Sequence, residues 1–276
     1  MIKDIVVNLT VGAQRDVAAD YAVSLGSTVG AHVAGIGFCY EVVVPGSVFG
    51  SVAVNLIQAQ RTENEKAANA AIANFEQSAR LAGISFEKRL ITASLVDGVD
   101  MFGRMTRRYD LAVVAQAEPD SPPGRDMIIE AALFQSGRPV VIVPYIQKDA
   151  CKLDRVMVCW DGSRNAARAT ADAMPLLARA KAVEVVVVAR GPGSAKELPG
   201  ADFAQHLARH GLKVELSELV AADIDVPNTI LSHAADAGTD FIVMGGYGHS
   251  RWREFVLGGA TRGILSSMTV PVLMSH

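Results

Sequence analysis

Residues 240–272 read DFIVMGGYGHSRWREFVLGGATRGILSSMTVPV, and this stretch is the most informative part of the sequence. An apolar run at 241–244 enters a glycine cluster at 245, 246 and 248. A second glycine pair at 258 and 259 precedes a segment suited to a helix. Glycines let backbone N–H groups approach an anion because no Cβ stands in the way, and a helix N-terminus adds the positive end of a dipole. The stretch therefore predicts a strand, an anion-binding glycine turn and a helix.

The stretch has a counterpart in the first half of the chain. Asp110-Leu-Ala-Val-Val matches Asp240-Phe-Ile-Val-Met, and Arg138-Pro-Val-Val-Ile matches Val270-Pro-Val-Leu-Met, at offsets of 130 and 132 residues. A repeat of this length indicates a duplicated domain. In both halves apolar strands alternate with helices, which favours a parallel sheet covered on both faces. We therefore expect an α/β protein with domains at residues 1–147 and 153–276.

The amphipathic patterns of the first half predict two helices in particular. One covers residues 15–26 and ends at a glycine, and a long one covers about 56–82. The second shows the one-sided apolar spacing of a helix that packs on a sheet. Both helices are expected to cover a face of the first sheet.

The two halves differ at the glycine turn. Opposite Gly245 the first half has Ala115, and opposite Gly248 it has Glu118. Opposite Gly258 and Gly259 lie Asp126 and Met127. Acidic side chains repel a polyphosphate, and a Cβ blocks close backbone approach. The sequence therefore predicts an anion site in the second half and its loss in the first.

Composition excludes several other classes of protein. Half of the 276 residues are hydrophobic and a fifth are charged, which predicts a packed globular core. The net charge of −3 gives no basic surface for nucleic acid, and the uncharged stretches are interrupted too often for a membrane span. The first strand begins at once, so no signal peptide is expected. Three cysteines without a paired pattern suit a reducing cytoplasm.

Three residues outside the glycine turn are candidates for a ligand site. Asp161 follows the first strand of the second half, where a carboxylate faces the ligand crevice of an open α/β sheet and can accept ribose hydroxyls. The residues leave a second interpretation equally open, in which Asp161 or Ser163 caps the next helix. Val188 and Met244 could line an apolar wall for a base, although buried sheet core is the plainer interpretation of both.

The spacing Gly245-x2-Gly248-x9-Gly258 resembles the G-x2-G-x9-G-(Ser/Thr) signature of the ATP-binding universal stress proteins. In this chain Gly259 replaces the usual Ser or Thr, and Thr261 follows two residues later. The resemblance implies two tandem flavodoxin-like domains, each with a mainly parallel five-stranded sheet flanked by helices.

The same resemblance implies a ligand and the residues that hold it. It implies ATP, AMP or ADP, with or without Mg²⁺, in the second domain only. Asp161 would contact the nucleoside and Met244 the base, with Val188 in the apolar wall. The predicted phosphate contacts are Gly245, Gly248, Gly258, Gly259, Ala260 and Thr261. The resemblance also implies that the domains pair through their last strands, 140–143 beside 272–274, and it leaves a homodimer open.

These features predict a nucleotide-occupied stress-response switch with at most slow ATP hydrolysis and no catalytic residue. Hydrolysis needs a positioned water and usually a metal ligand, and the sequence offers no clear candidate for either. His206 and His210 have a zinc-compatible spacing, but no third ligand accompanies them. Two alternatives stay open: a nucleotide hydrolase or adenylyl-transfer enzyme, and an interaction module that binds no nucleotide.

Overall fold

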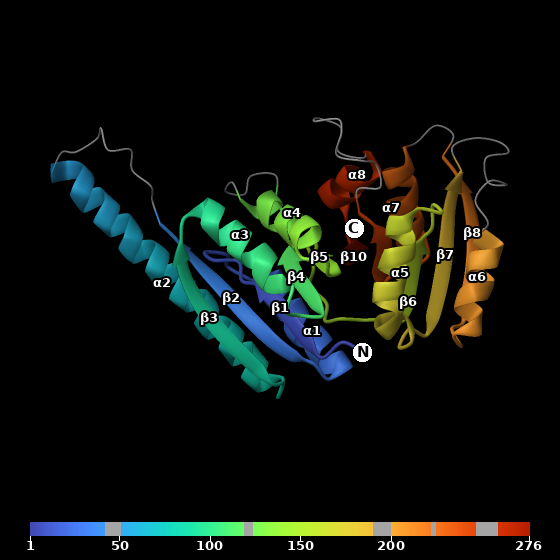
Figure 1. Cartoon of the computed structure of the whole chain (residues 1–276), viewed down its shortest axis with the longest axis horizontal. Helices are drawn as coiled ribbons and strands as arrows, with labels where there is room; N and C mark the ends of the chain where they lie inside the picture. Colours follow the sequence, from blue (N-terminus) through green and yellow to red (C-terminus); the bar gives the residue numbers. More distant parts are fainter. Residues whose placement is uncertain (42–50, 119–123, 190–199, 222–224, 247–258) are drawn as a thin grey trace.

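The computed structural model describes residues 1–41, 51–118, 124–189, 200–221, 225–246 and 259–276, and these residues form one ten-stranded sheet with helices on both faces (Figure 1). The strands of the first half are β1 (Asp4–Asn8), β2 (His32–Tyr40), β3 (Phe86–Ala93), β4 (Leu111–Ala115) and β5 (Val140–Val143). Those of the second half are β6 (Arg155–Cys159), β7 (Ala182–Ala189), β8 (Val214–Val220), β9 (Phe241–Gly245) and β10 (Val272–Ser275).

The strand order is β3-β2-β1-β4-β5-β10-β9-β6-β7-β8, so each half repeats the same five-stranded arrangement. Within each half the neighbouring strands run parallel. At the centre β5 and β10 pair antiparallel, with Val140 opposite Met274 and Ile142 opposite Val272. The predicted fold class, α/β with two tandem flavodoxin-like domains, is confirmed.

Two sets of helices cover the two faces of the sheet. One face carries α1 (Val17–Val29), α2 (Ser51–Leu81), α5 (Arg164–Leu177) and α6 (Gly200–Arg209). The other face carries α3 (Leu95–Thr106), α4 (Arg125–Gln135), α7 (Val226–Asp236) and α8 (Gly259–Ser267). Alternate strand residues point to alternate faces, so that Ile5 and Val7 pack under the first set and Val6 under the second.

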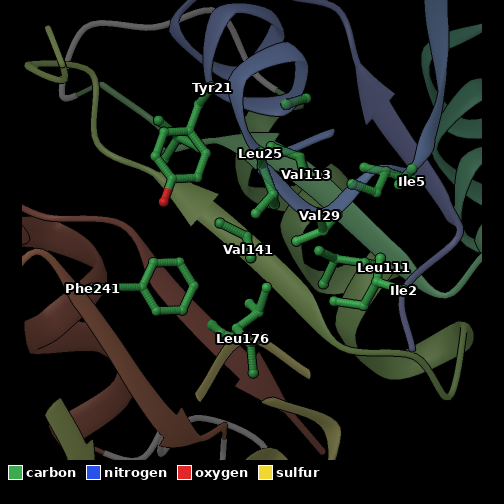
Figure 2. Packing of buried hydrophobic residues seen from close by; sticks show 14 of the residues in the cluster. Ile2, Ile5, Tyr21, Leu25, Val29, Leu111, Val113, Val141, Leu176 and Phe241 are labelled. Atoms are coloured by element: carbon green, nitrogen blue, oxygen red, sulfur yellow. The ribbon is translucent and has the colours of Figure 1, made fainter. Parts of the chain in front are cut away.

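Both apolar clusters run through the two halves without a break. Figure 2 shows Val141 of β5 between Leu25 of α1 in the first half and Leu176 and Phe241 of the second half. Each of these four side chains is fully buried. The halves therefore share one core as well as one sheet.

The segment between the halves is attached to α1. Arg15 donates hydrogen bonds from its guanidinium to the carbonyl oxygens of Gln147 and Lys148, at 3.3 and 3.2 Å. The backbone N–H of Cys151 donates to the Ser24 hydroxyl at 2.8 Å. The domain limits expected at 147 and 153 lie on either side of these contacts and stay a prediction.

The structure differs from the sequence prediction at the two helices named above. Helix α1 continues past Gly26 to Val29 and ends at Gly30, whose φ of 69° is left-handed. Gly26 is a packing residue instead, because a Cβ there would lie 2.5 Å from a Val33 methyl carbon. Helix α2 begins at Ser51, earlier than expected, and its first turns project past the sheet (Figure 1).

Candidate functional site

The candidate site lies at the carboxyl edge of the second half, where β6 and β9 are neighbours. The chain leaves β6 for β7 on one side of this pair, and it leaves β9 for β10 on the other side. The order of the strands therefore reverses between β6 and β9. Ligands of open α/β sheets bind at such a reversal, outside the carboxyl ends of the strands. Asp161, Val188, Met244 and Gly245 all come from strand ends at this edge.

Asp161 occupies the turn between β6 and α5, and its side chain is exposed. Its Oδ1 accepts a hydrogen bond from the Ser163 backbone N–H at 2.9 Å. The Ser163 hydroxyl in turn accepts from the Ala166 N–H at 3.1 Å, which makes Ser163 the N-cap of α5. Of the two roles weighed for Asp161, capping therefore belongs to Ser163, and the Asp161 carboxylate stays exposed at the edge of the sheet.

Gly245 ends β9 in direct contact with the first turn of α5. A Cβ on Gly245 would lie 2.6 Å from the Ala166 nitrogen and 2.7 Å from the Asn165 carbonyl carbon, which backbone atoms do not permit. Packing alone explains this glycine, and the anion contact predicted for it stays a prediction. The contact fixes the N-terminus of α5, the positive end of its dipole, beside Asp161 at the edge of the sheet.

Residues of three elements meet next to Gly245. The Asn165 side-chain amide of α5 donates to the Gly246 carbonyl oxygen at 2.6 Å. The His276 Nδ1 is 3.2 Å from the same oxygen, and the His276 ring packs edge-on against Phe134 of α4, with centroids 4.9 Å apart. The first half of the chain thus contributes Phe134 to the surroundings of the second-half site.

Val188 and Met244 belong to the face covered by α7 and α8. Met244 is buried and Val188 is partly exposed, and both pack in the apolar cluster on that face. Cys159 at the end of β6 packs there too. Burial, with a smaller effect of the Asp161 and Glu184 charges, raises the pKa of the Cys159 thiol to about 12. A thiol held in this state is not a nucleophile at neutral pH.

Helix α8 begins at Gly259, and its first turn holds the remaining predicted contacts. Gly259 is exposed, and a Cβ there would meet no atom within 4 Å among the described residues. Ala260 is partly buried, whereas Thr261 is only 4% exposed. Thr261 therefore lies on the inner side of α8 and does not present its hydroxyl to the surface. Gly248 and Gly258 lie outside the described residues.

A cavity of about 280 Å³ occupies the equivalent edge of the first half. The register of β2 on β1 in the first half is the same as that of β7 on β6 in the second half. Phe38 of the cavity therefore occupies the position that Val188 occupies in the second half. By the same reasoning Ala115 is equivalent to Gly245. The Glu118 carboxylate, predicted to repel phosphate, is paired with Arg125 at 2.6 Å. The sequence pattern did not predict this cavity, and Phe38 and Tyr40 at the end of an apolar strand are the signal that could have revealed it.

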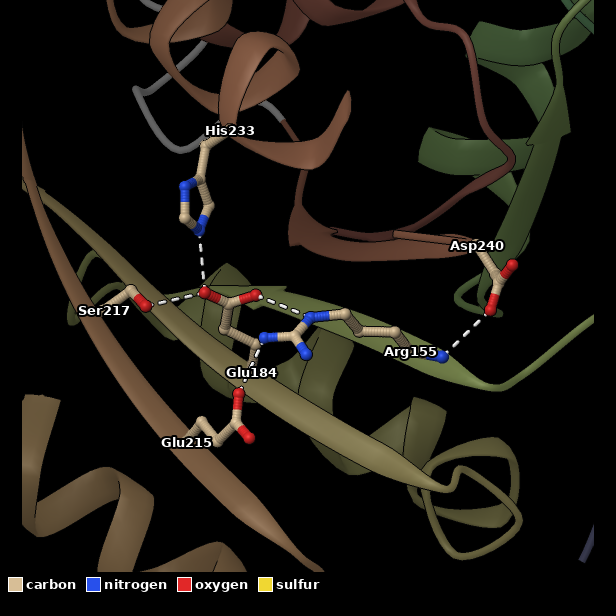
Figure 3. A network of polar contacts seen from close by, with 6 residues as sticks. All are labelled: Arg155, Glu184, Glu215, Ser217, His233 and Asp240. Carbon is tan, nitrogen blue, oxygen red and sulfur yellow. Dashed lines mark hydrogen bonds and ion pairs between the residues drawn. The ribbon is translucent and has the colours of Figure 1, made fainter. Parts of the chain in front are cut away.

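A buried polar network lies away from this edge, near the amino end of β7 (Figure 3). The Glu184 carboxylate accepts from the Ser217 hydroxyl at 2.6 Å and from Arg155 Nε at 3.3 Å, and it is 2.7 Å from His233 Nε2. Burial alone would raise the pKa of Glu184, but these hydrogen bonds and the charges of His233 and Arg155 hold it below its ordinary value. The network stabilises the junction of β6, β7, β8 and α7.

The described residues contain no group of three side chains that could hold a metal ion and no helix that could cross a membrane. The His206 and His210 rings contact each other, with centroids 4.9 Å apart, and no third ligand completes a group among the residues that the structure describes. None of the described helices combines the length and the apolar composition needed to cross a bilayer.

The duplicated, doubly wound sheet places the chain in the class of open α/β proteins, whose ligands bind outside the carboxyl ends of the strands. Residues 152–276 match the model of the Universal stress protein family. This match covers the second half of the chain and leaves residues 1–151 outside it.

Solved structures show the same fold over the whole chain. A universal stress protein from Archaeoglobus fulgidus DSM 4304 is 15% identical, with a TM-score of 0.71 and coverage of 99% of this chain and 97% of that one. A protein of unknown function from Pseudomonas aeruginosa PAO1 is 14% identical, with a TM-score of 0.62 and coverage of 99% and 92%. A comparison with curated proteins finds no match.

Proposed function

We propose that the second half binds an adenine nucleotide, ATP, ADP or AMP, and that the chain acts as a nucleotide-occupied stress-response switch. The observation that carries this proposal is the contact of Gly245 with the first turn of α5. It holds the helix N-terminus and the exposed Asp161 carboxylate together at the reversal of strand order, where nucleotides bind in open α/β sheets.

Each predicted residue except Thr261 has a role in this proposal. Asp161 accepts the ribose hydroxyls, and Val188 and Met244 support the base from the face under α7 and α8. Backbone N–H groups of Gly245, Gly248, Gly258, Gly259 and Ala260 hold the phosphates. A Cβ on Gly259 would meet no atom of the described residues within 4 Å, which suits a ligand in close contact with the start of α8. Buried Thr261 does not fit the hydroxyl contact predicted for it, so any Mg²⁺ would be held by the phosphates and water.

The proposal includes binding without rapid turnover. Hydrolysis needs a base or a polar group that orients the attacking water. Asp161 is the carboxylate that follows β6 at this edge of the sheet, and its Oδ1 already accepts from Ser163 in the turn. We therefore expect ATP to stay bound far longer than in a dedicated ATPase.

We also infer that the two domains pair within one chain through their last strands. The antiparallel register of β5 and β10 supports this inference, as do the two apolar clusters that cross it. Because β5 and β10 form backbone hydrogen bonds with each other, neither strand is left at the side of a sheet where a strand of a second chain could pair with it.

Calorimetric titration with ATP, with and without Mg²⁺, tests the proposal. One nucleotide should bind per chain. Asp161→Ala should weaken binding by about tenfold or more, because hydrogen bonds to a charged group contribute about 1.5–3 kcal/mol each. Asp126→Ala is the matched control: it removes an exposed carboxylate of the first half and should leave the affinity unchanged. Absence of binding would refute the proposal, and two nucleotides per chain would refute its restriction to the second half.

A further inference from the structure

The cavity in the first half is enclosed by the carboxyl ends of β1, β2 and β4 and by helices α2, α3 and α4. Its walls are mainly apolar, with aromatic rings on one side. The lining residues from the strands and their ends are Asn8, Leu9, Thr10, Val11, Phe38, Tyr40 and Ala115. Those from the helices and their starts are Asn64, Leu95, Gly124, Arg125 and Ile128.

Most of the polar groups in this lining already have partners. The Thr10 hydroxyl donates to Asp16, at 3.1 Å. The Asn64 amide donates to the Tyr40 carbonyl oxygen at 3.0 Å, and its oxygen accepts from Gln60 at 2.9 Å. These groups hold the walls in place and are not free to bind a ligand.

The described walls of the cavity offer no net charge to a ligand. Arg125 is the one ionised residue among the described lining residues, and its guanidinium donates to the Glu118 carboxylate at 2.6 Å. A polyphosphate in this cavity would face a cation that is already neutralised, and it would lose its hydration without a matching gain. The chemistry of the walls therefore favours a neutral molecule over a nucleotide.

In the lining of the cavity, two polar side-chain groups have no hydrogen-bond partner among the described residues. They are the Asn8 side-chain amide at the end of β1 and the Tyr40 hydroxyl at the end of β2. Burial raises the pKa of Tyr40 to about 12, so its hydroxyl stays protonated and able to donate. Ligand sites of this kind pair apolar walls with a few polar groups that fix the orientation of the ligand.

The shape and size of the cavity point to a flat molecule. The Phe38 and Tyr40 rings stack 5.9 Å apart with an angle of 7° between their planes, and aromatic faces pack well against a planar ligand. The volume of about 280 Å³ is nearly twice that of the roughly 150 Å³ apolar cavity that accepts benzene. Two fused rings match this space.

We propose that the first half binds a neutral aromatic molecule of two fused rings that carries a hydroxyl group, with its rings against Phe38 and Tyr40 and its hydroxyl at Asn8. This site is separate from the nucleotide site proposed for the second half and does not depend on it.

The probe 2-naphthol tests this proposal on the full chain by isothermal calorimetry. It should bind saturably with one molecule per chain, and an excess of ATP should not displace it. Val11→Trp should abolish binding by filling the cavity, and Val220→Trp is the matched control at an exposed position of the second half. Asn8→Leu keeps the branching and the number of heavy atoms, and it should weaken binding about fivefold through one lost hydrogen bond of about 1 kcal/mol.

Thermal melts establish that each variant is folded, and Asn8→Leu provides a second test if Val11→Trp is unstable. Three results would overturn the proposal: no saturable binding of 2-naphthol, binding that Val11→Trp leaves intact, and displacement of 2-naphthol by ATP. The last result would show that the first half holds a nucleotide site.

Discussion

Replacing Glu184 by glutamine should destabilise the chain far more than the same change at a neighbouring glutamate. The Glu184 side chain is 3% exposed, and its carboxylate contacts Ser217, His233 and Arg155 (Figure 3). A glutamine oxygen can still accept from Ser217 and His233. Its NH₂ group would face Arg155 Nε, so that two donors oppose each other in a buried site.

The size of the loss follows from these contacts. One charged hydrogen bond disappears and the others weaken as the negative charge is removed, and a bond to a charged group contributes about 1.5–3 kcal/mol. Removing one partner of a buried ion pair costs about 3–5 kcal/mol, an upper bound because Arg155 is 31% exposed and stays partly hydrated. We expect Glu184→Gln to lower the free energy of unfolding by about 2–4 kcal/mol at pH 7.

Urea denaturation followed by circular dichroism measures this difference. Glu215→Gln is the control, since Glu215 contacts the same arginine at 2.7 Å but is 60% exposed, and a surface ion pair contributes about 1 kcal/mol or less. Equal losses in the two variants, or no loss in Glu184→Gln, would refute the argument that the buried carboxylate stabilises this junction.

The pH dependence gives an independent check on the sign. The pKa of Glu184 is lower in the folded chain than its ordinary value of 4.5. Its charge therefore stabilises the fold fully above about pH 4.5, and this contribution is lost as the pH falls through the folded-state pKa. The stability difference between wild type and Glu184→Gln should shrink in acid, and a difference that grows would contradict the assigned direction.

Three further measurements test other parts of the structure. Gly245→Ala should destabilise the chain by about 1–3 kcal/mol through overpacking, whereas Gly259→Ala, whose Cβ would meet no described atom within 4 Å, should be neutral or stabilising in thermal melts. Burial raises the pKa of all three thiols, so iodoacetamide should modify the native chain at pH 8 much more slowly than the unfolded chain; equal rates would contradict this. A protease site inserted between Asp149 and Ala150 should leave one particle of about 29.2 kDa after cleavage, because the β5–β10 pair and both apolar clusters hold the two halves together. Two separate fragments in size-exclusion chromatography would show that the shared core is weaker than its burial indicates.

The sequence predicts the fold well because buried strands carry a strong signal. Runs such as Leu111–Ala115 and Phe241–Gly245 are apolar over their whole length, and such runs are typical of parallel strands with helices on both faces. The similar offsets of the two matching pairs of segments, 130 and 132 residues, are enough to indicate the duplication, because they are a property of the sequence alone.

The reason for each glycine is much harder to predict. Three glycines, which the sequence does not distinguish, have three different roles. Gly26 permits contact with Val33, Gly30 ends a helix at positive φ, and Gly245 permits close approach of the α5 backbone. Only the positions of neighbouring atoms distinguish these roles. The cavity at Phe38 and Tyr40 escaped prediction for a related reason, since empty space depends on side chains that are distant in sequence.

The pairing of β5 with β10 inside one chain also has a consequence for symmetry. Two identical chains that meet about a twofold axis must present the same site twice, and their pairing weakens on dilution. Here the partners are covalently joined, so their effective concentration is fixed by the linker and does not depend on how much protein is present. Each half is then free to accumulate its own substitutions. Ala115 at the end of β4 and Gly245 at the equivalent end of β9 could not coexist in a pair of identical single-domain chains.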